Sequence, residues 1–165
     1  MKITELNLSK AEEYLELTKI IDAESDYLLF EEGERKTTLE EQKNIIQTYL
    51  NEDNSIILVA EKDGQLVGYL TAKGGQAKRN KHSIYIAIGI RKDFTGQGIG
   101  TKLFKSLENW AVEQNVTRME LGVIDKNIPA FLLYKKMGFE LEGMKRNAFR
   151  IDGEYVNEYM MAKFL

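Results

Sequence analysis

Several residue types are scarce or missing in this sequence. Among its 165 residues there are no cysteines, one histidine and one proline. The absence of cysteine excludes disulfides, thiolate zinc sites and cysteine nucleophiles, and one histidine cannot build a multi-histidine metal site, so we expect no bound metal. No stretch approaches the roughly 20 consecutive apolar residues of a membrane span, and no signal-peptide pattern opens the chain. These absences predict a cytoplasmic protein without a membrane partner.

The net charge of the chain bears on whether it binds nucleic acid. The net charge is −3, whereas nucleic-acid-binding domains normally carry a strong basic footprint. The basic run Lys78-Arg79-Asn80-Lys81 is short and typical of a solvated surface. We therefore expect no nucleic-acid partner. The length and the 43% hydrophobic content predict one domain over residues 1–165 with a core of its own.

Apolar spacing and turn residues predict the order of the elements. Thr38 and Glu41 have the spacing of a helix capping box, and Asp63-Gly64 and Asp152-Gly153 are hairpin turn signals. The expected strands are 3–8, 55–61, 65–72, 83–90, 117–124 and one on each side of residues 152–153. The expected helices are 10–23, 38–50, one that begins near residue 99, and 127–136. This order predicts an α/β fold with one mixed sheet and helices on both of its faces.

The most informative stretch runs from Ile88 to Leu103, where an apolar strand enters alternating glycines and then a helix. Gly96, Gly98 and Gly100 free the backbone to turn several N–H groups toward one point. The helix start adds unpaired N–H donors and the positive end of the helix dipole. Residues 91–105 carry four basic side chains and one acidic side chain, a local charge of +3. The stretch therefore predicts an anion site, most often one for phosphate.

The glycine spacing distinguishes this loop from two common phosphate loops. A P-loop requires G-x-x-x-x-G-K-[ST], but Gly100 is followed here by Thr101 and then Lys102. The Rossmann fingerprint is G-x-G-x-x-G, whereas this loop reads G-x-G-x-G. A glycine-rich connection that serves only close packing is the remaining alternative.

Two motifs together resemble the GNAT superfamily of N-acetyltransferases over nearly the whole chain. The family signature Arg/Gln-x-x-Gly-x-Gly/Ala corresponds to residues 95–100, with Thr95 at the position of the Arg or Gln. A later family block corresponds to Asn127, Ala130 and residues 133–139, which read Leu-Tyr-Lys-Lys-Met-Gly-Phe. The ending of the chain is similar to the branch that holds amino-acid and ribosomal-protein N-terminal acetyltransferases.

The resemblance implies a seven-stranded, mostly antiparallel sheet that splays between its fourth and fifth strands. It also implies acetyl-CoA as the co-substrate, with the pantetheine arm along strand 83–90 and the pyrophosphate on the backbone N–H groups of residues 95–101. A homodimer is the one assembly we consider. The residues implied to contact acetyl-CoA are Ile88, Gly89, Ile90, Thr95, Gly96, Gln97, Gly98, Ile99, Gly100, Thr101, Asn127, Ala130, Tyr134 and Lys136.

Thr95 departs from the family pattern. Its hydroxyl can donate one neutral hydrogen bond, where the usual arginine would offer charge-assisted ones. We therefore expect weaker binding of acetyl-CoA unless Arg91 or Lys102 compensates.

Direct acetyl transfer needs a proton donor for the leaving thiolate and a neutral amine. The family motif implies Tyr134 as the general acid, since a phenol with a pKa near 10 can protonate a thiolate; otherwise this tyrosine only packs on its helix. The base is less defined, because residues 64–92 contain no Asp or Glu. Glu120 shares a strand face with Gly122, where some relatives carry a glutamate. His82 is the other candidate, because the unperturbed pKa of an imidazole is close to neutral pH. A water relay is a third candidate, and both side chains could instead be structural.

The acceptor is expected to be the α-amine of an amino acid or of a peptide N-terminus, attacking directly in a ternary complex. An α-amine with a pKa of ~7.8 costs about 1 kcal/mol to deprotonate at pH 7, whereas a lysine at ~10.4 costs about 4–5 kcal/mol. Glu31, Glu32 and Glu34 lie between the first two helices, on the acceptor side in this family, and either bind a cationic amine or form a solvated loop. The alternatives are acetylation of a polyamine, an aminoglycoside or a protein lysine, and a non-catalytic CoA-binding module.

Overall fold

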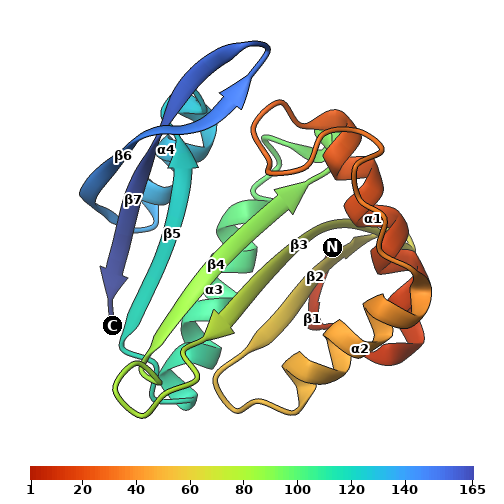
Figure 1. Ribbon diagram of the computed structural model, residues 1–165. Helices are drawn as coiled ribbons and strands as arrows, with labels where there is room; N and C mark the ends of the chain where they lie inside the picture. The colour runs from red at the N-terminus through yellow and green to blue at the C-terminus, as the bar shows by residue number, and fades with distance from the viewer.

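The computed structural model covers residues 1–165 and shows one seven-stranded sheet between two layers of helices (Figure 1). The strands are β1 (Lys2–Glu5), β2 (Ile56–Lys62), β3 (Gln65–Gly74), β4 (Ser83–Ile90), β5 (Arg118–Ile124), β6 (Glu140–Ile151) and β7 (Glu154–Phe164). The helices are α1 (Ala11–Glu24), α2 (Leu39–Leu50), α3 (Ile99–Glu113) and α4 (Ile128–Lys136), with 3-10 turns at Leu8–Lys10 and Lys92–Phe94. No helix has the length and apolar character that crossing a bilayer requires.

The sheet opens between β4 and β5. Its strand order is β1-β2-β3-β4-β5-β7-β6, and β4–β5 is the one parallel pair. These two strands pair only from Ser83↔Arg118 to Tyr85↔Glu120. Beyond that point β4 continues to Ile90 and β5 to Ile124, and the two diverge toward their carboxyl ends (Figure 1). The expected α/β fold with a splayed, mostly antiparallel sheet is therefore confirmed.

The two faces of the sheet are covered to different extents. On one face, a core of 21 residues joins α3 and α4 to strands β2 to β5 and to β7. On the other face, a core of 10 residues joins α1 and α2 to β2 and β3 only. The alternation along β4 separates the faces, because Ile84 and Ile86 are buried in the first core while Tyr85 and Ala87 are exposed on the α1 side.

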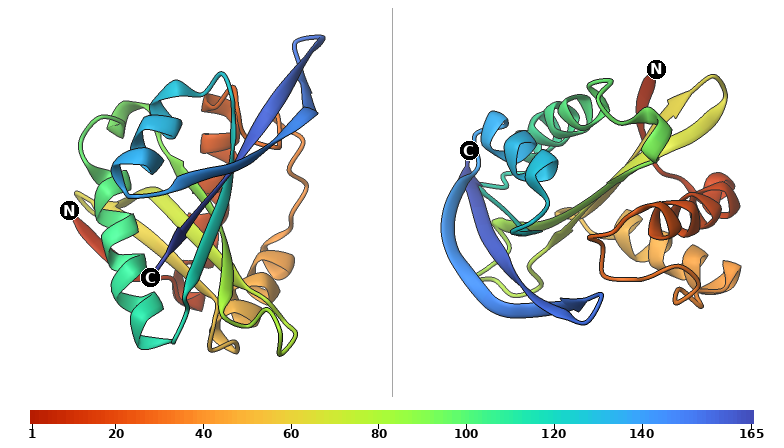
Figure 2. Two further views of the ribbon diagram at one scale, coloured as in Figure 1. Left: turned by 90° about the vertical axis from the view of Figure 1, so that its left-hand side faces the viewer. Right: turned by 90° about the horizontal axis from the view of Figure 1, so that it is seen from above.

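The α1 side of the sheet is consequently uncovered over β5, β7 and the first part of β4, whereas Ile21 of α1 covers β4 at Gly89. We call this surface the open face, and it carries Tyr85, Ala87, Glu120, Gly122 and Glu158. Seen from above, α1, α2 and the curled β6–β7 hairpin lie on this side of the sheet, and α3 and α4 lie on the opposite side (Figure 2).

Most local signals in the sequence have the expected structural outcome. Thr38 caps α2, and its hydroxyl and the Glu41 carboxylate form a reciprocal capping box. Both Asp-Gly turns adopt positive φ at the two central residues, as tight hairpins require. The first strand is the exception, because it ends at Glu5 and Leu8 begins a 3-10 turn instead. The Asn7 side chain accepts the Ser9 N–H there, and this cap ends the extended backbone.

Candidate functional site

The glycine loop, residues 95–101, follows the free end of β4 after the 3-10 turn Lys92–Phe94. Gly96 and Gly98 have left-handed φ angles of 72° and 78°, and a side chain at either position would meet no atom within 4 Å. Conformation rather than crowding therefore requires these two glycines. Gly98 caps α3, and the N–H of Lys102 is the first to bond back, to the Gly98 carbonyl at 3.1 Å. The preceding amides have no intrahelical acceptor.

This backbone fits an anion with several oxygens. The free amides at the start of α3 gather where the helix dipole is positive, and residues 95–98 are exposed to solvent. Lys136 of α4 reaches the same turn, with its amine 3.5 Å from the Thr101 hydroxyl. Lys102 is also exposed there. The phosphate-type site predicted from the sequence thus has converging backbone donors, with the cationic side chains of Lys102 and Lys136 beside them.

Two side chains near the loop are engaged within the protein. The Thr95 hydroxyl donates to the Lys92 carbonyl at 2.8 Å, so it closes a local turn. The Gln97 side chain accepts from Lys62 at 2.8 Å and donates to the Asp93 carbonyl at 3.1 Å. The Thr95 N–H is also used, because it donates to the Lys92 carbonyl at 3.2 Å, so Thr95 is not among the free amides, contrary to the expectation for residues 95–101. These contacts shape the loop and leave the backbone amides of residues 96–101 as its free donors.

Arg91 and Lys92 anchor the segment before the loop. The Arg91 guanidinium lies 5.5 Å from the centre of the Phe94 ring and donates to Gln65 at 3.2 Å. The Lys92 N–H donates to the Glu24 carboxylate at 2.6 Å, which fixes the end of α1 against this segment. Arg91 is therefore turned toward the protein, and Lys62, Lys102 and Lys136 are the cations beside the loop.

Helix α4 brings the second motif against the first. The Asn127 side chain caps α4 by accepting the Ala130 N–H at 3.3 Å. A side chain at Gly100 would lie 2.6 Å from Leu133 of α4, so a glycine there permits close approach of α3 and α4. The expected cofactor residues from β4, the glycine loop and α4 thus gather around the carboxyl end of β4.

Tyr134 lies in the core beneath the opening. It is 7% exposed, and its ring packs edge-on against Phe104 with centroids 5.8 Å apart. Burial raises the pKa of its phenol well above the usual value, and the phenols of Tyr85 and Tyr69 add to this effect. Tyr134 therefore keeps its proton at neutral pH and is able to act as a donor.

Glu120 is held in a charge network at the closed end of the opening. Its carboxylate accepts two hydrogen bonds from Arg118, at 3.0 and 2.9 Å, and Arg118 also pairs with Glu142 of β6. The pKa of Arg118 is raised by its hydrogen bond to Glu142 and by that to Glu120. The structure thus places Glu120 on the open face, as expected, but ties its charge to an arginine.

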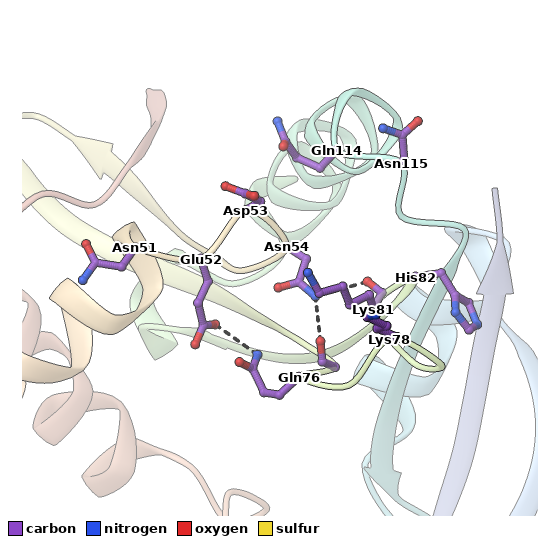
Figure 3. Close-up of a pocket in the computed structure, with 11 residues that line it drawn as sticks. Asn51, Glu52, Asp53, Asn54, Gln76, Lys78, Lys81, His82, Gln114 and Asn115 are labelled. Atoms are coloured by element: carbon purple, nitrogen blue, oxygen red, sulfur yellow. Dashed lines mark hydrogen bonds between the residues drawn. The ribbon is translucent and has the colours of Figure 1, made fainter.

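His82 lies away from the glycine loop. It precedes β4 and borders an entirely polar pocket of about 490 Å³ (Figure 3). Gln114, just past the C-terminal end of α3, lines the same pocket. The fifteen residues of α3 separate its two ends by about 22 Å, so this pocket is distinct from the anion loop. His82 also borders a smaller pocket that contains Tyr85 and Glu120.

The acidic residues between α1 and α2 are exposed. Glu31, Glu32 and Glu34 face solvent, and the Glu34 carboxylate accepts the Glu31 N–H at 2.7 Å. The connection is anchored by Arg35, which pairs with the buried Asp22 of α1 at 2.5 Å. The connection therefore lies on the side of the open face. The one hydrogen bond of these three acids, from the Glu31 N–H to Glu34, stays within the connection.

One carboxylate near the opening was missing from the sequence-based candidates. Glu158 of β7 lies over Gly122 of β5, and a side chain on Gly122 would come within 2.7 Å of its carboxyl group. The strand register explains this, since Glu158 is paired with Ile124 and leans toward the neighbouring Gly122. No local motif marks Glu158, because only the pairing of β5 with β7 brings it to the site.

Comparison with known proteins agrees with this geometry. Residues 17–139 match the acetyltransferase (GNAT) family. The L-amino acid N-acetyltransferase AaaT of Escherichia coli is 36% identical over 110 residues, which are 64% of this chain and 66% of that protein. A Bacillus subtilis protein, provisionally named a ribosomal protein bS18-alanine N-acetyltransferase, is 34% identical over 59% of this chain and 62% of its own length. The chain thus matches just under two thirds of each of these relatives.

Solved structures show the same fold. A GNAT acetyltransferase from Streptococcus pneumoniae superposes with a TM-score of 0.96 over 99% of both chains, at 27% identity. An acetyltransferase from Salmonella typhimurium, solved with acetyl-CoA, has a TM-score of 0.87 over 99% of this chain and 93% of its own, at 15% identity. With the splayed sheet, the glycine loop and the α4 motif in place, the chain belongs to the GNAT family of acetyltransferases.

Proposed function

We propose that this protein transfers an acetyl group from acetyl-CoA to the α-amine of an amino acid or of a peptide N-terminus. The observation that carries the proposal is the β4–β5 opening, at which the two strands stop pairing beyond Tyr85 and Glu120 while β4 continues toward the glycine loop. A co-substrate held by the glycine loop and an acceptor on the open face would meet at this opening. In this proposal the amine attacks the thioester directly in a ternary complex.

Acetyl-CoA fits the groups around the glycine loop. The free amides at the start of α3 and the nearby Lys136 would hold its pyrophosphate, and the unpaired edge of β4 near Ile88 and Ile90 would pair with its pantetheine arm. When bound, acetyl-CoA supplies an activated thioester. The buried phenol of Tyr134 keeps a proton available for the leaving sulfur.

The α-amine is the acceptor that makes the smallest demand on this site. Its deprotonation at pH 7 costs about 1 kcal/mol, compared with about 4–5 kcal/mol for a lysine side chain. The names of the two sequence relatives, which refer to amino-acid and alanine N-acetylation, support the same acceptor class. We propose that the α1–α2 connection, with Glu31, Glu32 and Glu34, borders the acceptor.

Release of free CoA from acetyl-CoA with a panel of amines tests this function. The panel contains the twenty amino acids, short peptides with free N-termini, spermidine, an aminoglycoside and N-α-acetyl-lysine. We expect turnover with amino acids or peptides, and loss of it when their α-amine is blocked. Turnover confined to spermidine, the aminoglycoside or the lysine derivative would contradict the acceptor class, and binding of acetyl-CoA without any turnover would favour a binding module.

Replacing Thr95 by arginine is expected to tighten acetyl-CoA binding. The hydroxyl of Thr95 is used by the Lys92 carbonyl, whereas an arginine on this exposed loop adds a charge-assisted donor near the pyrophosphate. An exposed charge interaction contributes up to about 1 kcal/mol, so the dissociation constant should fall about fivefold by titration calorimetry. Thr95→Gln, which adds length without charge, is the control. An arginine variant that binds no tighter than the glutamine variant would show that the loop has enough charge already.

A further inference from the structure

The open face holds two carboxylates beside the β4–β5 opening, and they differ in how they are bound. Glu120 accepts two hydrogen bonds from Arg118 and lies at the last β4–β5 pair, where the sheet is still closed. Glu158 projects over Gly122, two residues further along β5, where the strands have separated. Glu158 forms none of the ion pairs of the structure. Its carboxylate is therefore the free one.

The space that holds this carboxylate exists because residue 122 is a glycine. An added side-chain carbon at Gly122 would lie 2.7 Å from the Glu158 carboxyl carbon, closer than packed atoms approach. Gly122 has an ordinary strand conformation, so its backbone does not itself require a glycine. The missing side chain on β5 thus makes room for a carboxylate supplied by β7.

The groups around Glu158 leave it available to a ligand. Lys145 is its register partner on β6, yet the two charged groups are not within ion-pair distance. Tyr85, on the opposite side of the opening, has its phenol pKa raised by burial and by the negative charges of Glu158 and Glu120. Glu158 is only partly buried. A half-buried, unpaired carboxylate beside a phenol offers a cationic or N–H-bearing group a favourable place to bind.

We propose that Glu158 accepts a hydrogen bond from the acceptor amine and takes the proton that its nitrogen loses on acetylation. This inference rests on the proposed function, because it assigns a residue to the acceptor side of the same β4–β5 opening. Tyr134 lies on the α3 and α4 side of the sheet, and Glu158 lies on the α1 side. The proton acceptor and the proton donor therefore lie on opposite faces of the sheet, so the nitrogen and the sulfur on the tetrahedral carbon can each face one of them.

The proton balance is simple. The nitrogen–carbon bond forms, the carbon–sulfur bond of the thioester breaks, and the sulfur receives a proton from Tyr134. The nitrogen becomes positively charged as its new bond forms, so an ordinary carboxylate is basic enough to take its proton. Exchange with water returns a proton to Tyr134 and removes one from Glu158. The products are the N-acetylated amine and the free thiol of CoA, with no other reactant consumed.

Glu158→Gln tests the assignment because it keeps the size of the side chain and removes its basicity. We expect kcat/KM for the best amine of the panel to fall about 100-fold, while the dissociation constant of acetyl-CoA and the thermal midpoint stay within error of the wild type. Glu154→Gln is the matched control, since Glu154 lies on the same strand but pairs with Lys126 at the exposed hairpin end. It should remain within twofold of the wild type.

Moving the carboxylate to the neighbouring strand provides the second arm. Glu158→Ala should lower kcat/KM as Glu158→Gln does. Adding Gly122→Glu to Glu158→Ala should raise kcat/KM again by at least tenfold, because the shorter side chain at residue 158 leaves the space above residue 122 empty. The inference is overturned if Glu158→Gln is as active as the wild type, or if the Gly122→Glu, Glu158→Ala pair is no better than Glu158→Ala alone. A wild-type protein that acetylates no amine would overturn the proposed function itself, and this inference with it.

Discussion

Replacing Tyr134 by phenylalanine is expected to lower kcat at least about 100-fold. General-acid catalysis contributes about 10² to 10⁴ in rate, and the change removes the phenol while keeping the ring that packs against Phe104 and Phe139. The dissociation constant of acetyl-CoA should change little, because the glycine loop and Lys136 are untouched. Steady-state kinetics with a saturating amine, together with titration calorimetry, separate the two quantities.

The buried Tyr14 of α1 gives a matched control for this substitution. Like Tyr134 it is almost fully buried and has a pKa raised chiefly by burial, but it belongs to the core between α1 and the sheet. Tyr14→Phe should therefore leave kcat unchanged. A Tyr134→Phe protein with wild-type kcat would show that Tyr134 only packs, and that the sulfur takes its proton from water.

The raised pKa of Tyr134 also fixes an expected pH dependence. A general acid acts in its protonated form, and burial keeps the Tyr134 phenol protonated beyond its ordinary pKa of about 10. Ionisation of this residue should therefore cause no fall in kcat up to about pH 10. A fall of kcat in the wild type near pH 8, absent from Tyr134→Phe, would contradict the assignment.

Local signals in the sequence were sufficient for the parts of the site that one segment builds. The glycine loop, the N-cap at Asn127 and the capping box at Thr38 each depend on residues within a few positions of one another. Their geometry follows from backbone rules that act over one turn. The splay between β4 and β5 was expected only through the family resemblance, because no residue in either strand encodes it.

The acceptor end of the site depended on strand pairing, which a single sequence does not reveal. Glu120 was placed on the correct face by alternation along β5, but the second partner of its arginine, Glu142, reaches Arg118 only because β6 folds back beside β7. Glu158 reaches Gly122 through the β5–β7 register. Such contacts join residues about 20 to 40 positions apart, where propensity and periodicity carry no information.

Removing the Asp22 carboxylate is expected to destabilise the protein and loosen the acceptor side together. Asp22 is 3% exposed on α1 and receives two hydrogen bonds from Arg35, at 2.5 and 3.2 Å. Arg35 in turn lies 4.9 Å from the ring centre of Phe30, so this pair fixes the connection between α1 and α2. Without the Asp22 carboxylate, the half-buried guanidinium of Arg35 has no ion-pair partner. Breaking a buried ion pair in this way costs about 3–5 kcal/mol.

Because Arg35 retains access to water, we expect Asp22→Ala to lower the free energy of unfolding by about 3 kcal/mol, the lower end of that range. In a chain of this size this corresponds to a fall in Tm of roughly 6–12 °C. Glu40→Ala, which removes an exposed pair with Lys43 at 3.9 Å, is the control and should cost less than about 0.5 kcal/mol. Urea denaturation measures both changes in the free energy of unfolding.

Since the α1–α2 connection borders the open face, Asp22→Ala should also raise KM for the amine, while the dissociation constant of acetyl-CoA stays unchanged. A destabilised variant with an unchanged amine KM would show that this connection plays no part in binding the acceptor.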